Sequence, residues 1–152
     1  MIKKKKVIAI ASVGGHWIQL LRIVKPLEKE FDIIYISTHK KCSRLVEGHI
    51  FYCIRDFSRW DFYKLVPEFF RILNILHKEK PDVVITTGAA PGLICLLAAK
   101  LCVTKTVWID SIANVEHLSF SGRIAIKFAQ RVYTQWHELE TEKVRYVGNI
   151  FN

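Results

Sequence analysis

Two glycines and a histidine, Gly14, Gly15 and His16, stand together in the stretch ASVGGHWIQL, between an apolar run and a helical pattern. Glycine permits positive φ and lets a ligand approach the backbone closely. A helix that begins near Trp17 offers free N–H groups and a positive dipole end, which together bind phosphate. An imidazole can donate a hydrogen bond or act as a general base. The stretch therefore predicts a phosphate-binding turn with His16 as a catalytic residue, or a plain tight turn capped by the histidine.

A second glycine turn occurs in TTGAAPG, where a Val/Ile-rich run ends and another helix opens near Pro91. Thr86 and Thr87 could hydrogen-bond a phosphate or a sugar, with Gly88 providing the turn. Taken alone, the stretch is equally compatible with an ordinary connection between strand and helix. A second turn of this kind beside the first favours a binding site.

The third candidate is WIDSIANVEHLSFSG, which follows another apolar run. Asp110, Ser111 and Asn114 suit the recognition of sugar hydroxyls. The alternative interpretation is local capping, with Ser119 or Ser121 at the start of the helix that follows.

The stretch from Arg59 to Lys78 combines cations with aromatic residues. Its cations recur every seven residues, so a helix places them on one stripe. A basic stripe beside exposed aromatic side chains is typical of a helix lying on a membrane, and each cation near an anionic bilayer contributes about 1 kcal/mol. The alternative is a core helix with a solvated basic edge. The residues expected at a membrane are Arg59, Trp60, Lys64, Phe70, Arg71 and Lys78, assisted by the lysines at 3–6.

The elements that must position these residues alternate between β-rich runs and helical patterns. The expected strands are 6–12, 31–38, 49–56, 81–88, 105–111, 131–136 and 143–149, and the expected helices are 17–30, 61–80 (from Pro67 at the latest), 91–101 and 121–130. This alternation predicts an α/β fold, a Rossmann-like doubly wound and mostly parallel sheet. Such sheets bind ligands at the carboxyl ends of their strands, where the candidate stretches and YVGN would converge.

Length and composition limit the alternatives. The chain has 152 residues, 51% of them hydrophobic, and a net charge of +9, which predicts one folded domain, 1–152, with an anionic partner. The apolar run after Lys6 is too short for a signal peptide, and no run approaches the roughly 18 residues of a membrane span. The four cysteines form no CxxC pair and are expected to be reduced core thiols, with Cys95 and Cys102 on one buried helix face. We expect no metal and no cofactor.

Four stretches in this order, SVGGHWIQLL, KPDVVITTGAAPG, WIDSIANVEHLSFSGRIAIKFAQRVYTQW and YVGNIF, resemble the PssD-type subunits of polysaccharide biosynthesis. These are relatives of the acceptor-side, membrane-recruiting subunit of the N-glycan UDP-N-acetylglucosamine transferase. They are also similar to the amino-terminal half of the MurG glycosyltransferases. The resemblance covers nearly the whole chain.

The resemblance implies the acceptor half of a GT-B glycosyltransferase that is divided into two subunits. A separate partner would bind the UDP-sugar, and the heteromer would transfer the sugar to a lipid-linked, polyprenyl diphosphate saccharide in exopolysaccharide or capsule biosynthesis. The protein would be cytoplasmic and peripheral on the inner face of the cell membrane. The loop at Gly14–His16 would face the acceptor diphosphate, with His16 deprotonating the acceptor hydroxyl. Relatives often carry Glu where this chain has Asp110, and Arg near Asn114.

Two other functions stay open at this level. The first is a self-sufficient nucleotide-binding Rossmann enzyme. The first loop lacks the dinucleotide fingerprint, but Asp32 follows it at a distance where contact with a ribose is possible. The second is a basic nucleic-acid-binding module, which predicts salt-dependent affinity. Because no nucleic-acid motif accompanies the charge, we expect no nucleic-acid partner.

Overall fold

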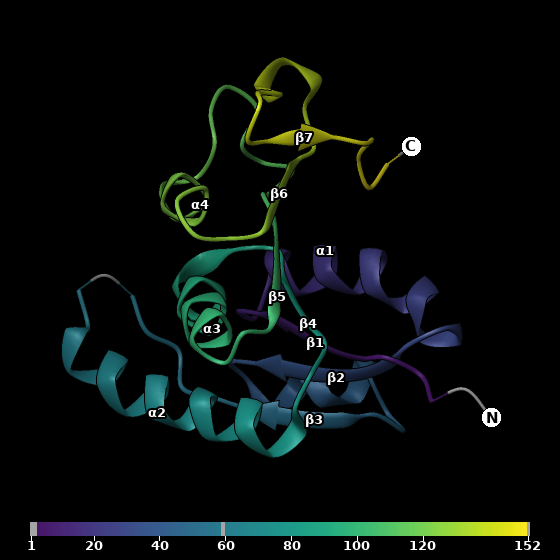
Figure 1. Cartoon of the computed structure of the whole chain (residues 1–152), viewed down its shortest axis with the longest axis vertical. Helices are drawn as coiled ribbons and strands as arrows, with labels where there is room; N and C mark the ends of the chain where they lie inside the picture. Colours follow the sequence, from purple (N-terminus) through teal and green to yellow (C-terminus); the bar gives the residue numbers. More distant parts are fainter. Residues whose placement is uncertain (1–2, 59, 152) are drawn as a thin grey trace.

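The computed structural model describes residues 3–58 and 60–151 and contains one parallel sheet of seven strands in the order β3-β2-β1-β4-β5-β6-β7 (Figure 1). The strands are Lys6–Ala11 (β1), Asp32–Ser37 (β2), Ile50–Cys53 (β3), Val83–Thr86 (β4), Lys105–Ile109 (β5), Arg131–Thr134 (β6) and Arg145–Tyr146 (β7). The α-helices are Gly15–Val24 (α1), Phe62–Glu79 (α2), Ala89–Leu101 (α3) and Phe120–Ala125 (α4). Short 3₁₀ helices occupy Lys25–Lys29 (η1), Lys40–Leu45 (η2) and His137–Leu139 (η3). The predicted Rossmann-like, doubly wound fold is confirmed.

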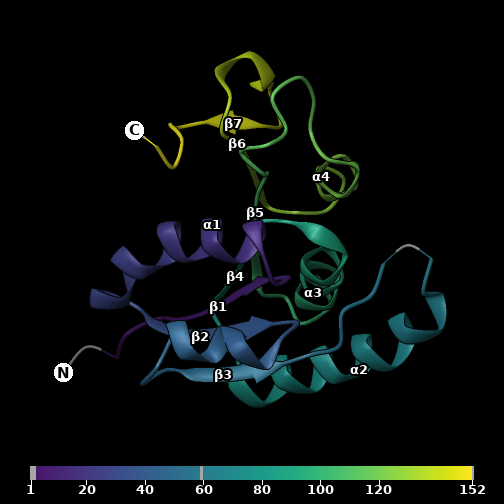
Figure 2. The ribbon, with the colours of Figure 1, turned by 180° about the vertical axis from the view of Figure 1, so that it is seen from behind.

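Helices cover both faces of the sheet at its centre, and β1 is apolar on both sides for that reason. On β1, Ile8 and Ile10 point into a core formed with α2 and α3, whereas Val7 and Ala9 point toward α1. Figure 2 shows the same layers from behind. The continuous apolar run of β1 therefore reflects two separate cores, one on each face.

The predicted helix 61–80 is confirmed, since α2 spans Phe62–Glu79, and the other three predicted helices have different bounds. The first begins at Gly15 and changes to 3₁₀ geometry at Lys25, because Pro26 cannot donate the next helical hydrogen bond. The helix α2 has Pro67 inside it, and α3 begins at Ala89, earlier than the predicted start at Pro91. The helix α4 ends at Ala125, earlier than expected, and Ser119 caps it by accepting a hydrogen bond from the Gly122 N–H at 2.9 Å.

The cysteines are all unpaired, and two of them are buried. Burial raises the pKa of the Cys95 thiol to about 12, which keeps it protonated and unreactive. The expectation that Cys102 shares that buried face is wrong. It is exposed because α3 ends there, with Cys102 as its C-cap.

The direction of winding reverses between β1 and β4, which lie side by side at the centre of the sheet. The chain leaves β1 into α1 on one face and leaves β4 into α3 on the other. The two connections therefore meet at the carboxyl edge of the sheet, where open α/β sheets bind their ligands.

Candidate functional site

The first two glycine turns interlock at this edge. The Thr87 hydroxyl donates a hydrogen bond to the His16 carbonyl at 2.7 Å, and His16 Nδ1 lies 3.0 Å from the Thr87 carbonyl. Thr86 is buried, and its hydroxyl accepts a hydrogen bond from the Gly88 N–H at 3.3 Å. The structure thus brings two loops separated by about seventy residues of sequence into one unit.

The pairing defines the protonation of the His16 ring. A carbonyl oxygen only accepts hydrogen bonds, so Nδ1 must carry the hydrogen that joins it to Thr87. In the neutral ring Nε2 then has a free lone pair, and within the described chain no group donates to it. That arrangement is the one a general base requires.

Gly14 and Gly88 each precede a helix and adopt positive φ, +102° and +132°. No neighbouring atom lies within 4 Å of a Cβ built on Gly14 or Gly15, so the backbone there is open to a ligand. The N–H groups at the start of α1 therefore face a turn that is open to a ligand. This geometry is compatible with binding a phosphate.

Asp110 is buried at the end of β5 and organises the third candidate stretch. Its carboxylate accepts four hydrogen bonds, from Trp108 Nε1, Asn114 Nδ2 and both the amide and the hydroxyl of Ser119. The distances lie between 2.6 and 3.0 Å. Both carboxylate oxygens therefore fix the loop that leads into α4. The Asn114 amide, which donates to one of them, also fixes this loop. Ser111 Oγ accepts from the Ala113 N–H at 3.2 Å within the same turn.

Two glutamines that the sequence did not single out tie this loop to the rest of the site. Gln19 on α1 and Gln135 after β6 are both buried, and both donate to the Asp110 carbonyl, at 3.1 and 3.0 Å. Gln19 also accepts from the Ile112 N–H, and Gln135 accepts from the Ile150 N–H. For Gln19 the usable signal was a polar side chain within the apolar stripe of its helix, whereas Gln135, which follows β6, carried no such signal.

Asp32 lies at the start of β2, paired with Lys6 at the amino end of β1. It is therefore on the edge of the sheet opposite Gly14 and cannot reach a ribose bound there. The ribose contact left open by the sequence is wrong for this reason.

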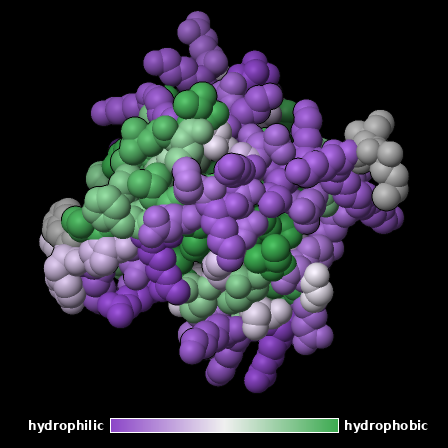
Figure 3. Space-filling view, turned by 60° about the horizontal axis from the view of Figure 1, so that its bottom comes forward, coloured by the Kyte–Doolittle hydropathy of each residue, from purple (hydrophilic) through white to green (hydrophobic). Residues whose placement is uncertain are grey.

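The start of α2 presents aromatic and apolar side chains to solvent. Trp60, Tyr63, Val66 and Phe70 are between 56% and 78% exposed. Apolar surface gathers at the left of Figure 3, the side where Figure 1 places the start of α2 together with α3 and α4. Arg59, one of the predicted membrane residues, lies outside the described residues.

The cations of α2 are partly engaged within the helix. Lys64 lies 3.5 Å from Asp61, and Arg71 lies 3.9 Å from Glu68. Lys78 is exposed and lies over the Tyr52 ring. Because Asp61 and Glu68 partly neutralise Lys64 and Arg71, the positive potential along α2 is lower than the number of its cations suggests.

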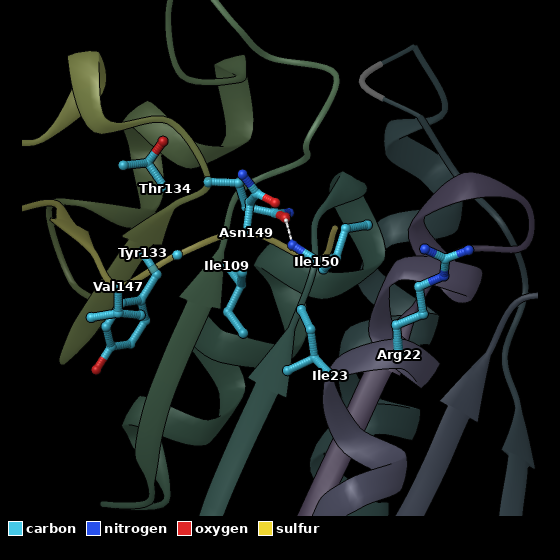
Figure 4. Close-up of a pocket in the computed structure, with 10 residues that line it drawn as sticks. Arg22, Ile23, Ile109, Tyr133, Thr134, Val147, Asn149 and Ile150 are labelled. Atoms are coloured by element: carbon cyan, nitrogen blue, oxygen red, sulfur yellow. Dashed lines mark hydrogen bonds between the residues drawn. The ribbon is translucent and has the colours of Figure 1, made fainter. Parts of the chain in front are cut away.

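A groove of about 470 Å³ opens beside the site, on the face of the sheet that carries α1 (Figure 4). Its walls are Arg22 and Ile23 of α1 on one side and the segment from Val147 to Ile150 on the other. Ile109 and Tyr133 form its floor. The sequence alone did not indicate this groove.

In the described part of the chain, no helix is long and apolar enough to cross a bilayer. No group of three or more His, Cys, Asp or Glu side chains gathers there as metal ligands.

The fold and its edge loops define a Rossmann-like domain of the kind found at the amino-terminal half of GT-B glycosyltransferases. MurG of Acinetobacter baumannii superposes with a TM-score of 0.80 at 18% identity, covering 95% of this chain and 46% of that chain. The UDP-N-acetylglucosamine 2-epimerase of Rickettsia bellii superposes with a TM-score of 0.75 at 15% identity, covering 98% and 46%. These similarities concern the fold alone.

The chain belongs to the family described as "Oligosaccharide biosynthesis protein Alg14 like", whose model matches residues 61–150. It is 24% identical to the UDP-N-acetylglucosamine transferase subunit ALG14 of Yarrowia lipolytica, over 88% of this chain and 74% of that protein. It is 25% identical to UDP-N-acetylglucosamine--N-acetylmuramyl-(pentapeptide) pyrophosphoryl-undecaprenol N-acetylglucosamine transferase of Geobacillus thermodenitrificans, over 98% of this chain. The chain spans only 46% of that transferase, about half its length.

Proposed function

We propose that this chain is the acceptor-binding, membrane-associating subunit of a two-component glycosyltransferase of the PssD type. In this proposal residues 1–152 form a single acceptor domain. A partner subunit supplies a UDP-sugar, and the sugar is transferred to a polyprenyl diphosphate saccharide in exopolysaccharide or capsule biosynthesis. The protein works at the cytoplasmic face of the cell membrane.

The observation that carries this proposal is the interlocked pair of loops at Gly14–His16 and Thr86–Gly88. It forms an open, glycine-lined turn at a helix start, with a histidine whose Nε2 is free. The diphosphate of a lipid-linked acceptor suits the helix start, and a sugar hydroxyl suits the imidazole.

In the proposed reaction, His16 Nε2 accepts the proton of the acceptor hydroxyl. The hydroxyl oxygen then forms a bond to the anomeric carbon of the donor sugar as the bond to UDP breaks, with inversion. Thr87 holds the His16 ring through its carbonyl, at 3.0 Å from Nδ1. Asp110, Ser111 and Asn114 shape the loop that borders the acceptor, with Asp110 acting through the hydrogen bonds that it accepts.

The proposal of a separate partner subunit is supported by the named relatives. The chain spans about half of a transferase whose printed name states its complete reaction, whereas the Yarrowia relative is named as a subunit. In this proposal the partner supplies the second domain that a GT-B cleft needs.

Membrane contact is assigned to α2 together with Trp60. Trp60, Tyr63 and Phe70 provide interfacial aromatic surface, and Lys64, Arg71 and Lys78 provide positive charge. Placing a peripheral protein by this surface would bring its acceptor loops near a lipid-linked substrate.

The test is a transfer assay with membranes of the source organism and a panel of radiolabelled UDP-sugars. The chain is assayed alone and together with the protein of that organism that is similar to the other half of the Geobacillus transferase. Transfer that requires both proteins is expected. Transfer by this chain alone contradicts the two-component proposal, and no transfer by the pair with any UDP-sugar contradicts the proposed activity.

A further inference from the structure

Gln19 is a polar side chain on the buried face of α1, and no step of the proposed reaction uses it. Only 3% of its surface is exposed. Its amide makes two hydrogen bonds to one stretch of backbone. Nε2 donates to the Asp110 carbonyl at 3.1 Å, and Oε1 accepts from the Ile112 N–H at 3.1 Å. One side chain therefore holds the backbone immediately before and immediately after Ser111.

Residues that follow β6 hold the same backbone from a second direction. Gln135 is also 3% exposed and donates to the Asp110 carbonyl at 3.0 Å. Trp136 Nε1 donates to the Ile112 carbonyl at 2.8 Å. Figures 1 and 2 both place the start of α1 next to the end of β5, where these bonds form. The peptide that joins Asp110 to Ser111 is therefore fixed by two neighbouring elements.

This clamp leaves two hydrogen-bond donors on Ser111. The peptide before Ser111 is trans and planar, so the Ser111 N–H points away from the Asp110 carbonyl and from the glutamine amides that hold it. Within the described chain that N–H donates to no group. The Ser111 hydroxyl accepts from the Ala113 N–H, and its own proton has no acceptor among the described residues. Ser111 is only partly buried, and unpaired donors at such a position favour a ligand that accepts hydrogen bonds.

The helix that carries Gln19 also carries the proposed base. His16 lies three residues before Gln19, on the neighbouring turn of α1, and is bonded to Thr87 in the loop after β4. Because the hydrogen bonds of a helix keep its turns together, the clamp fixes Ser111 relative to the His16 ring. Transfer requires the acceptor to contact its binding groups and the base at the same time.

From these contacts we infer that Gln19 is a positioning residue for the acceptor. It holds the backbone so that the Ser111 N–H and hydroxyl donate to a sugar oxygen of the lipid-linked acceptor, whose reacting hydroxyl then lies at His16. An amide suits this role because it both donates and accepts, whereas an apolar side chain would leave the Ile112 N–H unpaired. Two donors on the Asp110 carbonyl also polarise the peptide and strengthen its N–H as a donor. The inference rests on the proposed function.

The experiment measures transfer by the complete heteromer. Lipid extracted from the membranes of the transfer assay is the acceptor, and the KM for this lipid and the KM for the UDP-sugar are determined separately. Gln19→Met keeps the length of the side chain and removes both hydrogen bonds. Gln19→Glu keeps only the bond from the Ile112 N–H. The matched controls are Gln130→Met and Gln130→Glu, at an exposed position after α4.

Gln19→Met is expected to raise the KM for the acceptor about tenfold and to leave the KM for the UDP-sugar unchanged, because only acceptor binding depends on the clamped backbone. A purely structural role would lower the amount of active heteromer and change neither KM. The Gln130 controls should keep both native values.

Gln19→Glu provides a second readout through pH. Burial raises the pKa of the introduced carboxyl, and its protonated form again donates to the Asp110 carbonyl. The KM for the acceptor, relative to the native heteromer at the same pH, should therefore approach the native value as pH falls from about 8 to about 6. The same ratio for Gln19→Met should not change with pH.

Ser111→Ala tests the group through which Gln19 acts. The loss of one neutral hydrogen bond should raise the KM for the acceptor about threefold to tenfold. Combined with Gln19→Met, it should give less than the product of the two separate increases, because both changes act on the same donors.

Several results overturn the inference while leaving the proposed function intact, provided that the native heteromer transfers sugar. They are a native KM for the acceptor in Gln19→Met or in Ser111→Ala, an equal increase in the Gln130 controls, and a Gln19→Glu profile parallel to that of Gln19→Met. Unfolding of both Gln19 variants, measured by circular dichroism, would assign the residue to the fold alone and also overturns it. If the native heteromer transfers no sugar, the proposed function fails and the inference fails with it.

Discussion

The ring of His16 lies directly against the α-carbon of Gly88. A Cβ added to Gly88 would stand 2.8 Å from His16 Cε1 and 2.9 Å from Nδ1, closer than real Cβ contacts. The absence of a side chain at residue 88 is therefore what allows the imidazole to sit between the two glycine turns and bond the Thr87 carbonyl.

We predict that Gly88→Ala displaces His16 and strongly reduces transfer by the heteromer. The substitution adds a clash to the cost of positive φ, so the domain should lose about 1–3 kcal/mol of unfolding free energy. Thermal unfolding and a transfer assay measure the two effects. Gly48→Ala is the control, because Gly48 also has positive φ (+85°) but has no atom within 4 Å of the added Cβ. Equal activity of the two variants would contradict the role given to the contact.

His16→Ala should abolish transfer while leaving the fold intact. The change removes one hydrogen bond, which is worth about 1 kcal/mol, but also removes the proposed base. Circular dichroism and single-turnover transfer separate folding from chemistry. His77→Ala, at an exposed position of α2, serves as the matched histidine control. Turnover near the native rate in His16→Ala would exclude a catalytic role.

Asp110→Asn should destabilise the domain by about 2–4 kcal/mol. The asparagine amide group would face donors where the carboxylate accepts four hydrogen bonds, so at least one buried donor loses its partner. Chemical denaturation measures the loss. Ser111→Ala, in the same turn, should change stability by less than about 1 kcal/mol, because its hydroxyl bonds only the nearby Ala113 amide. A native-like Asp110→Asn would show that the carboxylate does not organise the loop.

The triple reversal Lys64→Glu, Arg71→Glu and Lys78→Glu should release the chain from anionic liposomes in flotation. Each cation near such a surface contributes about 1 kcal/mol, and the reversal replaces attraction with repulsion. The control reverses Lys40, Lys41 and Arg44, which gives the same net charge away from α2. Unchanged flotation of the α2 variant would show that this stripe is not the anchor.

Glu79 should contribute stability that disappears in acid. The hydrogen bond from Tyr52, together with Lys6, holds the pKa of the Glu79 carboxyl below its ordinary value, although burial opposes the shift. A lowered folded-state pKa stabilises the protein above the ordinary carboxyl pKa, and this contribution is lost as pH falls through the folded value. Glu79→Gln should therefore cost stability at pH 7 and reduce the acid dependence of unfolding. Identical pH profiles for both proteins would refute this linkage.

Local patterns in the sequence were sufficient to predict the strands and helices and their order along the chain. Continuous Val/Ile runs such as 6–12 and 81–88 predicted buried parallel strands, because a strand covered on both faces has no polar side. The end of the first helix, near Pro26, was predicted less accurately, since proline removes a hydrogen-bond donor without defining where the neighbouring turns end.

The candidate site was predicted only as a set of loops. Gly14, His16 and Thr87 could be placed at one edge because parallel strands align their carboxyl ends. Their pairing, and the bonds of Gln19 and Gln135 to the Asp110 carbonyl, join residues far apart in the chain. No local pattern encodes such contacts.

The sequence by itself therefore determined the fold class and the edge where the loops gather, since hydrophobic periodicity and glycine positions are local properties. Only the tertiary structure decided that His16 Nδ1 bonds Thr87, that Asp110 is engaged within its own loop, and that Gln19 holds the backbone on both sides of Ser111. These three features depend on which side chains meet once the sheet has formed. Packing between segments that are distant in the sequence decides that.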